Sequence, residues 1–253
     1  MSTSVHYLSK TKVGEITLDH PKNNLLNLDT LLDLISAFEN SAKKEDKCVL
    51  FKATGPNFTV GADLKSIHKL VQDQDNTKFH NFSKAFQDLT RAMLNHPGII
   101  IIGLHGWVVG GGFEISLSAD IRYATKKTRI MLPELSLGTM FSNASTKLLG
   151  QIVGLGRAKE LMLLGEEISA ERGYEIGLLN KICEDDNLED EMNITAGKII
   201  SGIDQHALKL AKALIHKNLD LSIEEVLDNE LEVLSDLSTH KEFIEKINKF
   251  VNK

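Results

Sequence analysis

The chain has 253 residues, of which 42% are hydrophobic and 25% are charged, a balance typical of a soluble globular protein. This length is enough for one large α/β domain with a sizeable core, or for such a core with a small helical appendage. The formal net charge is −6 and Lys and Arg form no long run, which argues against nucleic acid as the main partner. The apolar runs are too short to cross a bilayer, so we expect no membrane partner.

The cysteines and the N-terminal residues favour a reducing, cytoplasmic setting. Cys48 and Cys183 are far apart in the sequence and predict neither a disulfide framework nor a metal site. Residues 1–7 have neither the apolar core of a secretion signal nor the Arg-rich character of a transit peptide. We therefore expect a cytoplasmic protein without a bound metal.

The residues before position 55 predict a strand–helix–strand unit. Residues 13–18 predict a strand, which Asp19-His20-Pro21 ends. Asn27 is the predicted N-cap of a helix whose apolar side chains recur at helical spacing, namely Leu28, Leu31, Leu32, Ile35 and Phe38. Residues 48–51 predict a short buried strand, and this order of elements is typical of an α/β protein.

The middle of the chain predicts a helix followed by a central strand. Residues 54–63 predict a loop, and residues 68–78 form a polar stretch ahead of the helix. The helix carries an apolar stripe that we expect to pack in the core, namely Phe79, Phe82, Phe86, Leu89 and Met93. Pro97-Gly98 ends the helix, and residues 99–104 predict a central strand because their β-branched isoleucines make both faces apolar.

The second half of the chain is expected to be mainly helical. Residues 113–119 predict a short helix, and residues 121–124 and 129–132 predict strands on either side of a charged turn. From Thr146 onward helices dominate. Two amphipathic stripes close the chain, one of Ile223, Val226, Leu227, Leu231 and Leu234 and one of Phe243, Ile244, Ile247, Phe250 and Val251. Their apolar surface exceeds what a tail needs, so we expect them to pack on a partner subunit or on the chain's own core.

Gly110-Gly111-Gly112, between a buried strand and a short helix, is the first of three features that could carry chemistry. Glycines let a ligand approach the backbone amides, and amides at a helix N-terminus favour negative charge, so the turn suits a phosphate or an oxyanion. A dinucleotide-binding fingerprint needs a small residue where the chain has Ile115. Glu134 lies at about the spacing of the ribose-binding acid of that fingerprint, but it follows Pro133 instead of ending a strand. Glu114 is either a catalytic acid or a carboxylate that the start of its helix stabilises by about 0.3–1 kcal/mol.

The other two features are a turn of small residues and an acidic loop that begins with proline. The amides of residues 60–65 could complete an oxyanion site and Lys65 could meet a phosphate, although an ordinary turn with a surface lysine explains the same residues. Glu134 lies between Leu132 and Leu135. Apolar neighbours raise the pKa of a carboxyl group and suit it to proton transfer near neutrality, whereas a loop-exposed glutamate is the alternative.

In this order, the three features resemble the crotonase (enoyl-CoA hydratase/isomerase) family. Gly61-Ala62-Asp63-Leu64-Lys65 resembles the first oxyanion segment of the family, residues 105–114 its glycine-rich segment, and residues 132–138 its second acidic segment. Residues 20–23, 118–124, 153–160 and 176–180 are further similar segments. The resemblance therefore spans nearly the whole chain.

The resemblance implies an α/β fold, built as a spiral of repeated ββα units and followed by a C-terminal helical region that drives trimer formation. We expect residues 1–195 to form this core with the active site. Residues 196–253 are expected to form the helical region for oligomerisation and pocket closure. The expected partners are an acyl-CoA thioester and further copies of the chain, as a trimer or a dimer of trimers.

The resemblance also implies roles for individual residues. The backbone amides of Ala62 and Gly111 would form an oxyanion hole for the thioester oxygen. Glu114 and Glu134 match the two positions that are both glutamate in hydratases. The residues expected to line the CoA site are Ala62, Asp63, Leu64, Lys65 and Gly111. CoA is expected as the carrier of the substrate, with no tightly bound cofactor.

The implied activity is the addition of water across a 2-enoyl-CoA double bond through an oxyanion-stabilised thioester enolate. A double-bond isomerase, which needs mainly one base, and a non-catalytic acyl-CoA-binding scaffold are the alternatives. Residues 140–146 depart from the hydratase pattern, which has Pro and several glycines there. This loop lies near the acyl pocket in the family. Its bulk and polarity count against crotonyl-CoA as the substrate and are similar to those of hydratases that act on cyclic dienoyl-CoA thioesters.

Overall fold

The computed structural model describes residues 4–21, 23–74 and 76–252. The chain divides into two compact units, Met1–Ser201 and Gly202–Lys253. The expected boundary between residues 195 and 196 falls inside helix α8 (Leu188–Gly202), whose buried Met192 and Ala196 lie on either side of it. Within the described part of the chain, no helix is both long and apolar enough to span a membrane.

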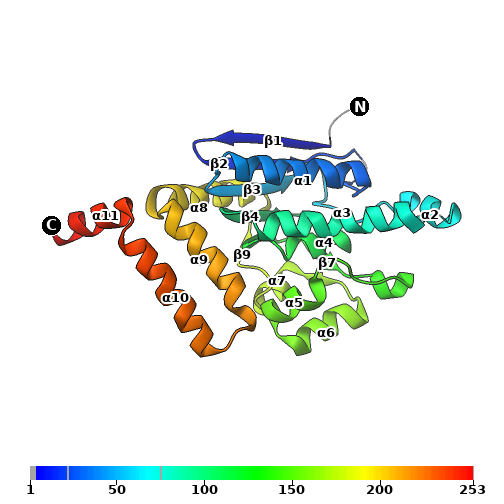
Figure 1. The fold of residues 1–253 in the computed structure, drawn as a ribbon. Helices are drawn as coiled ribbons and strands as arrows, with labels where there is room; N and C mark the ends of the chain where they lie inside the picture. The colour runs from blue at the N-terminus through cyan, green and yellow to red at the C-terminus, as the bar shows by residue number, and fades with distance from the viewer. Residues whose placement is uncertain (1–3, 22, 75, 253) are drawn as a thin grey trace. The chain divides into compact units, whose positions relative to one another are not determined.

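The first unit is built on a six-stranded sheet in the order β1-β2-β3-β4-β6-β9 (Figure 1). Its strands are β1 (Val5–Lys10), β2 (Val13–Leu18), β3 (Cys48–Ala53), β4 (Ile99–Leu104), β6 (Ile121–Thr125) and β9 (Lys181–Cys183). β1 and β2 pair antiparallel, and the other neighbouring strands pair parallel. Parallel neighbours need crossover connections, which is why helices separate them in the sequence. The predicted strand–helix–strand unit and the central strand β4 are confirmed.

A second sheet of three short strands, in the order β5-β7-β8, gives the fold its repeat. Its strands are β5 (Trp107–Val109), β7 (Arg129–Met131) and β8 (Ile168–Ser169). The chain passes from β4 in the large sheet to β5 in the small one and then into helix α4 (Gly111–Ser116). It repeats this route from β6 to β7 and, after a loop, into α5 (Ser145–Val153). Successive strands in different sheets followed by a helix form the predicted spiral of ββα units.

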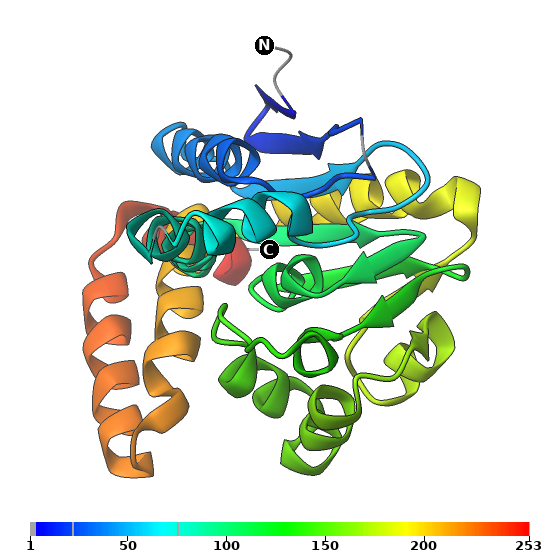
Figure 2. The ribbon, with the colours of Figure 1, turned by 90° about the vertical axis from the view of Figure 1, so that its right-hand side faces the viewer.

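The crossover helices α1 (Leu28–Lys43) and α3 (Asn76–Leu94) lie together on one side of the large sheet (Figure 2). Asn27 is the N-cap of α1, as predicted, and its side chain accepts from Thr30 N at 2.9 Å. The predicted apolar stripe of α1 is partly wrong, because Leu28 and Leu32 are exposed and Leu34 is fully buried instead. In α3 the first residue of the stripe, Phe79, is exposed. The others are buried, namely Phe82, Phe86, Leu89 and Met93.

Residues 68–72 are helical, in contrast to the polar stretch read from the sequence. They belong to α2 (Leu64–Gln72), which has Asp63 as its N-cap and has no buried residue among its nine. The cap explains the start of this helix, because the Asp63 carboxylate accepts from Lys65 N at 3.0 Å and from Ser66 Oγ at 2.8 Å. Capping starts this helix, and its apolar side contacts the core through the partly buried Ile67 and Leu70.

The remaining elements are helices and 3₁₀ turns. In the first unit they are the 3₁₀ turn η1 (Glu134–Leu137), α6 (Leu155–Leu164), α7 (Ala170–Glu175) and η2 (Asp185–Asn187). The second unit consists of α9 (Gln205–Lys217), η3 (Asn218–Asp220), α10 (Ile223–Ser238) and α11 (Lys241–Val251). Most of the two predicted C-terminal stripes is exposed on α10 and α11, including Leu231 at 65% and Phe250 at 82%.

Candidate active site

The glycine-rich turn joins β5 to α4 and approaches its neighbours too closely for side chains. Gly110 has φ +56°, and a Cβ on it would lie 2.9 Å from Glu134 Oε1. A Cβ on Gly112 would lie only 2.0 Å from the Cγ2 of Thr59. The N–H of Gly110 donates to Met131 O at 2.9 Å, which ties the turn to β7. Glycine at these positions lets backbone, Thr59 and Glu134 meet in one place.

The turn around Gly61 and Ala62 lies against the glycine-rich turn. Gly61 has φ +88°, and a Cβ there would lie 2.7 Å from Val109 O and 3.8 Å from Gly111 N. Thr59 holds the two segments together, because Val109 N donates to Thr59 O at 3.1 Å and Gly61 N donates to Thr59 Oγ1 at 3.1 Å. The two predicted oxyanion segments, about fifty residues apart in the sequence, are therefore neighbours.

Among the residues that the structure describes, the backbone amides of Ala62 and Gly111 have no hydrogen-bond acceptor. Leu26 pairs with the residues on either side of Ala62, because Leu26 N donates to Gly61 O at 2.9 Å and Asp63 N donates to Leu26 O at 3.0 Å. Gly111 is the first residue of α4, where backbone N–H groups have no partner within the helix. Among the described residues, neither of these two N–H groups donates a hydrogen bond. Two free donors on adjacent turns can stabilise one negatively charged oxygen.

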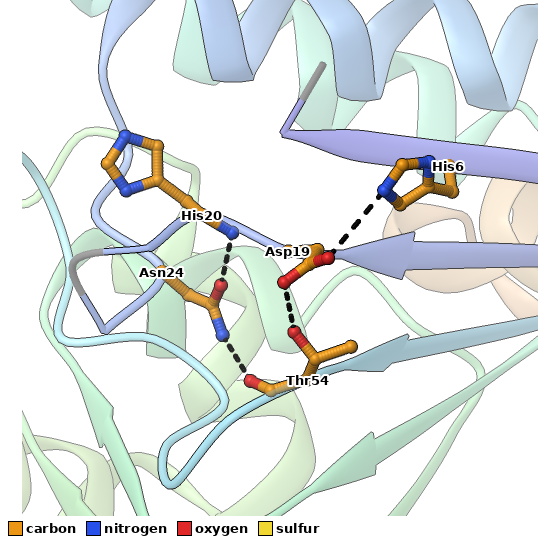
Figure 3. Close-up of polar contacts among 5 residues, drawn as sticks. All are labelled: His6, Asp19, His20, Asn24 and Thr54. Carbon is orange, nitrogen blue, oxygen red and sulfur yellow. Dashed lines mark hydrogen bonds and ion pairs between the residues drawn. The ribbon is translucent and has the colours of Figure 1, made fainter. Parts of the chain in front are cut away.

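Asn24 anchors the loop that follows β3, and Figure 3 shows its contacts with His20 and Thr54. Its amide nitrogen donates to Thr54 O at 2.8 Å and to Asn57 O at 2.9 Å, and its side-chain oxygen accepts from His20 N at 2.7 Å. Asn24 is buried and has φ +57°, a conformation that Asn tolerates better than most residues. It therefore joins the loop after β2 to the loop after β3, from which the Ala62 turn follows.

Glu114 is a buried carboxylate, 2% exposed, in the first turn of α4. Its Oε2 accepts from Ser142 N at 3.0 Å, from Asn143 N at 3.3 Å and from the hydroxyl of Ser145. Burial raises the pKa of Glu114, and the hydrogen bonds from Ser145, Asn143 and Ser142 oppose that rise. All three groups donate to Oε2, so Oε1 accepts fewer hydrogen bonds from the protein.

Glu134 is the second buried carboxylate, and its environment differs from that of Glu114. It is 7% exposed, and among the described residues its Oε2 is buried without a hydrogen-bond partner. Burial, with a smaller contribution from the charge of Glu114, raises the pKa of Glu134 to about 7. A carboxyl with this pKa holds a proton on about half of the molecules at neutral pH and suits proton transfer there.

Four of the five predicted CoA-lining residues, 62–65, lie where the Ala62 turn becomes α2, and the fifth, Gly111, is the first residue of α4. Asp63 is the cap of α2, whereas Leu64 and Lys65 are exposed. Within the described residues, no cluster of three or more His, Cys, Asp or Glu side chains could hold a metal ion. A cavity of about 500 Å³ lies elsewhere, next to Lys52, Gly103 and Asp185, and none of the predicted site residues lines it. The candidate active site lies at the carboxylates and the free amides and not at this cavity, because those groups can take part in a reaction.

Sequence reasoning missed the partners of Glu114. Residues 140–146 were read as an unusual loop near an acyl pocket, without a link to either glutamate. Ser142, Asn143 and Ser145 contact Glu114 across 28 to 31 positions of sequence. The polar residues that stand in place of the expected glycines were the only signal in the sequence, and they do not show which residue they contact.

Over nearly its whole length the chain is similar to proteins of one family. The model of the family described as enoyl-CoA hydratase/isomerase matches residues 9–253. A short-chain-enoyl-CoA hydratase of Clostridium acetobutylicum is 32% identical, over 96% of this chain and 92% of that protein. A trans-2-decenoyl-acyl-carrier-protein isomerase of Streptococcus mutans is 26% identical, over 95% of this chain and 92% of that protein. The structure of an enoyl-CoA hydratase from Thermoplasma volcanium matches with a TM-score of 0.88 and 26% identity, over 98% of this chain and 97% of that one.

Proposed function

Because the chain belongs to the enoyl-CoA hydratase/isomerase family, we propose that it adds water across the double bond of a 2-enoyl-CoA thioester. The pair of buried carboxylates, Glu114 and Glu134, is the observation that favours hydration over the other reactions. They differ in hydrogen bonding and therefore suit different roles in one reaction. The similarity to the short-chain-enoyl-CoA hydratase supports the same choice.

The free amides of Ala62 and Gly111 supply the first part of the chemistry. Addition of water at C3 moves electrons through the double bond to the thioester oxygen, which becomes an enolate oxygen. Two preorganised N–H donors stabilise that charge, and removing one such donor costs about 3–4 kcal/mol in comparable oxyanion holes. Backbone donors on turns of small residues suit this task because no side chain keeps the substrate away.

The two carboxyl groups divide the proton transfers. Ionised Glu114 accepts a proton from the water while the water oxygen bonds to C3, and protonated Glu134 donates its proton to C2. The product gains OH at C3 and H at C2, and one proton then returns from Glu114 to Glu134 through solvent. The rise in the pKa of Glu134 to about 7 favours this assignment, because a carboxyl must be protonated to act as the acid.

Replacing each carboxyl group tests the proposal. We expect Glu114→Gln and Glu134→Gln each to lower kcat by about 100-fold or more, the usual scale of general acid–base catalysis. Hydration is followed as loss of enoyl absorbance, and mass spectrometry with ¹⁸O-water verifies the gain of one water. Exposed Glu160→Gln is the matched control and should keep the wild-type rate. Wild-type rates in both active-site variants would show that the assignment is wrong.

Double-bond isomerisation is the second candidate, and the similarity to the S. mutans isomerase favours it. Migration of a double bond removes a proton from one carbon and returns a proton to another, so one base is enough. Glu134 is then the base, and Glu114→Gln should retain most of the activity. A product of unchanged mass from the wild-type protein would favour this reaction over hydration.

The CoA site and the assembly of subunits belong to the same proposal. Residues 62–65 line the CoA moiety, with the amine of Lys65 available to a phosphate group, and CoA leaves with the product as a carrier. The apolar surfaces of α10 and α11 pack on other copies of the chain in a trimer or a dimer of trimers. The exposure of Leu231 and Phe250 supports this assembly, because apolar surface of that extent is rarely left in water.

A further inference from the structure

Ser145 is a buried hydroxyl whose hydrogen-bond partner is Glu114, the proposed general base. It is 1% exposed and is the first residue of α5. Its hydroxyl donates to Glu114 Oε2, the same atom that accepts from the backbone amides of Ser142 and Asn143. Of these three donors, the Ser145 hydroxyl is the one that belongs to a side chain, so a substitution can remove it alone.

We propose that Ser145 is a positioning residue for Glu114, which fixes Oε2 so that Oε1 is the oxygen that accepts from the reacting water. A carboxylate oxygen has about two lone-pair sites, and three donors at Oε2 leave no place there for water. The inference rests on the proposed function, and it names the residue that orients one of the two acids. Ser145 acts through Glu114 and does not itself touch the substrate.

The loop that carries Ser145 is held in one conformation. Ala144 has φ +57°, an uncommon conformation for a residue other than glycine, and it directs the chain into α5. Asn143 is fully buried, and its amide donates to Gly111 O at 3.4 Å while its oxygen accepts from Ser142 Oγ at 3.1 Å. The loop therefore contacts both the oxyanion turn and Glu114. Backbone held away from its favoured conformations is common at functional sites.

The hydrogen bond from Ser145 also helps Glu114 to stay ionised while Glu134 is protonated. Burial raises the pKa of Glu114, and the hydrogen bond from Ser145 is the largest effect that opposes this rise. The charge of Glu114 contributes to the rise in the pKa of Glu134, which reaches about 7. Without the Ser145 hydroxyl, burial of Glu114 is opposed less and its pKa moves upward, so fewer molecules hold Glu114 ionised while Glu134 is protonated.

Kinetics of matched variants test the inference. We expect Ser145→Ala to lower kcat about tenfold or more, because a hydrogen bond to a charged group is lost, with a small change in KM. The acid limb of the pH profile should move to higher pH, since Glu114 must be ionised to accept a proton. Ser145→Thr keeps the hydroxyl and should restore most of kcat. Thr146→Ala removes an exposed hydroxyl from the next residue and should match wild type.

A direct titration separates this inference from the proposed function. The carboxyl carbon of Glu114 is followed by ¹³C NMR against pH and is assigned by its loss in Glu114→Gln. Ser145→Ala should move the midpoint to higher pH, and Thr146→Ala should leave it in place, whichever reaction the enzyme catalyses. An unmoved midpoint overturns the inference, and so does a moved midpoint with unchanged kcat. If the wild-type protein hydrates no enoyl-CoA while the midpoint still moves, the proposed hydration fails and the contact with Glu114 stands.

Discussion

Glu134 is predicted to destabilise the fold at the pH where it serves catalysis. Its carboxyl is buried, its Oε2 has no partner among the described residues, and its pKa rises from the ordinary value of 4.5 to about 7. Glu134→Gln replaces it with a neutral side chain of nearly the same shape. We expect the variant to lose activity and to gain stability at alkaline pH.

The size of the gain follows from the shift in pKa. A rise from 4.5 to about 7 corresponds to about 3 kcal/mol of cost to the folded state when the carboxyl is ionised. Water that reaches the site reduces this cost, so we expect about 1–3 kcal/mol. Below pH 4.5 the carboxyl is protonated in both the folded and the unfolded chain, and the cost is absent. Between 4.5 and about 7 the unfolded chain releases the proton first, so wild-type stability falls as pH rises through this window.

Urea unfolding at a series of pH values measures the effect. The difference in the free energy of unfolding between Glu134→Gln and wild type should be small at pH 5 and should reach its full value near pH 8. Glu160→Gln removes an exposed carboxyl and should show no such rise with pH. A difference for Glu134→Gln that is equally large at both pH values would refute the reasoning, because it would then not depend on ionisation.

Two further predictions concern the scaffold. Asn24→Ala removes hydrogen bonds to His20 N, Thr54 O and Asn57 O, and should lower the free energy of unfolding by about 2–4 kcal/mol, measured by urea denaturation. Phe250→Asp places a charge at a side chain that is 82% exposed on α11, and it should shift a trimer toward monomer in analytical ultracentrifugation. Asn248→Asp adds the same charge to an exposed polar position of α11, and its assembly should match wild type.

The strands β2, β3, β4, β6 and β7 were predictable because their signals are local, whereas the short β5, β8 and β9 were not predicted. The isoleucines of β4 make both faces apolar, as a central strand requires, and Asn27 caps α1 through a bond to a residue three positions later. The buried face of α1 was harder to predict. It includes Ser41, whose hydroxyl donates to buried Asp46 at 2.8 Å, so hydrophobicity alone could not find the true stripe.

The apolar C-terminal stripes show a different limit. Periodicity identified the helices α10 and α11, and the same spacing left open whether their apolar faces meet the chain's own core or a partner. Phe250 and Leu231 are largely exposed in the single chain. The periodicity indicates that one face of each helix is apolar, but it does not indicate what covers that face.

The sequence identified the two glutamates and part of the difference between them. Apolar neighbours predict a raised pKa for Glu134, whereas Glu114 is expected at the start of a helix, which favours its charged form. The structure gives Glu114 three donors from residues 142–145 and leaves Oε2 of Glu134 without a partner among the described residues. Donors favour the ionised form and burial without donors favours the neutral form, so these distant contacts support the proposed roles of Glu114 as base and Glu134 as acid. If Ser145→Ala leaves Glu114 and Glu134 equally protonated, the different roles of the two carboxyl groups depend on this loop and not on the glutamates alone.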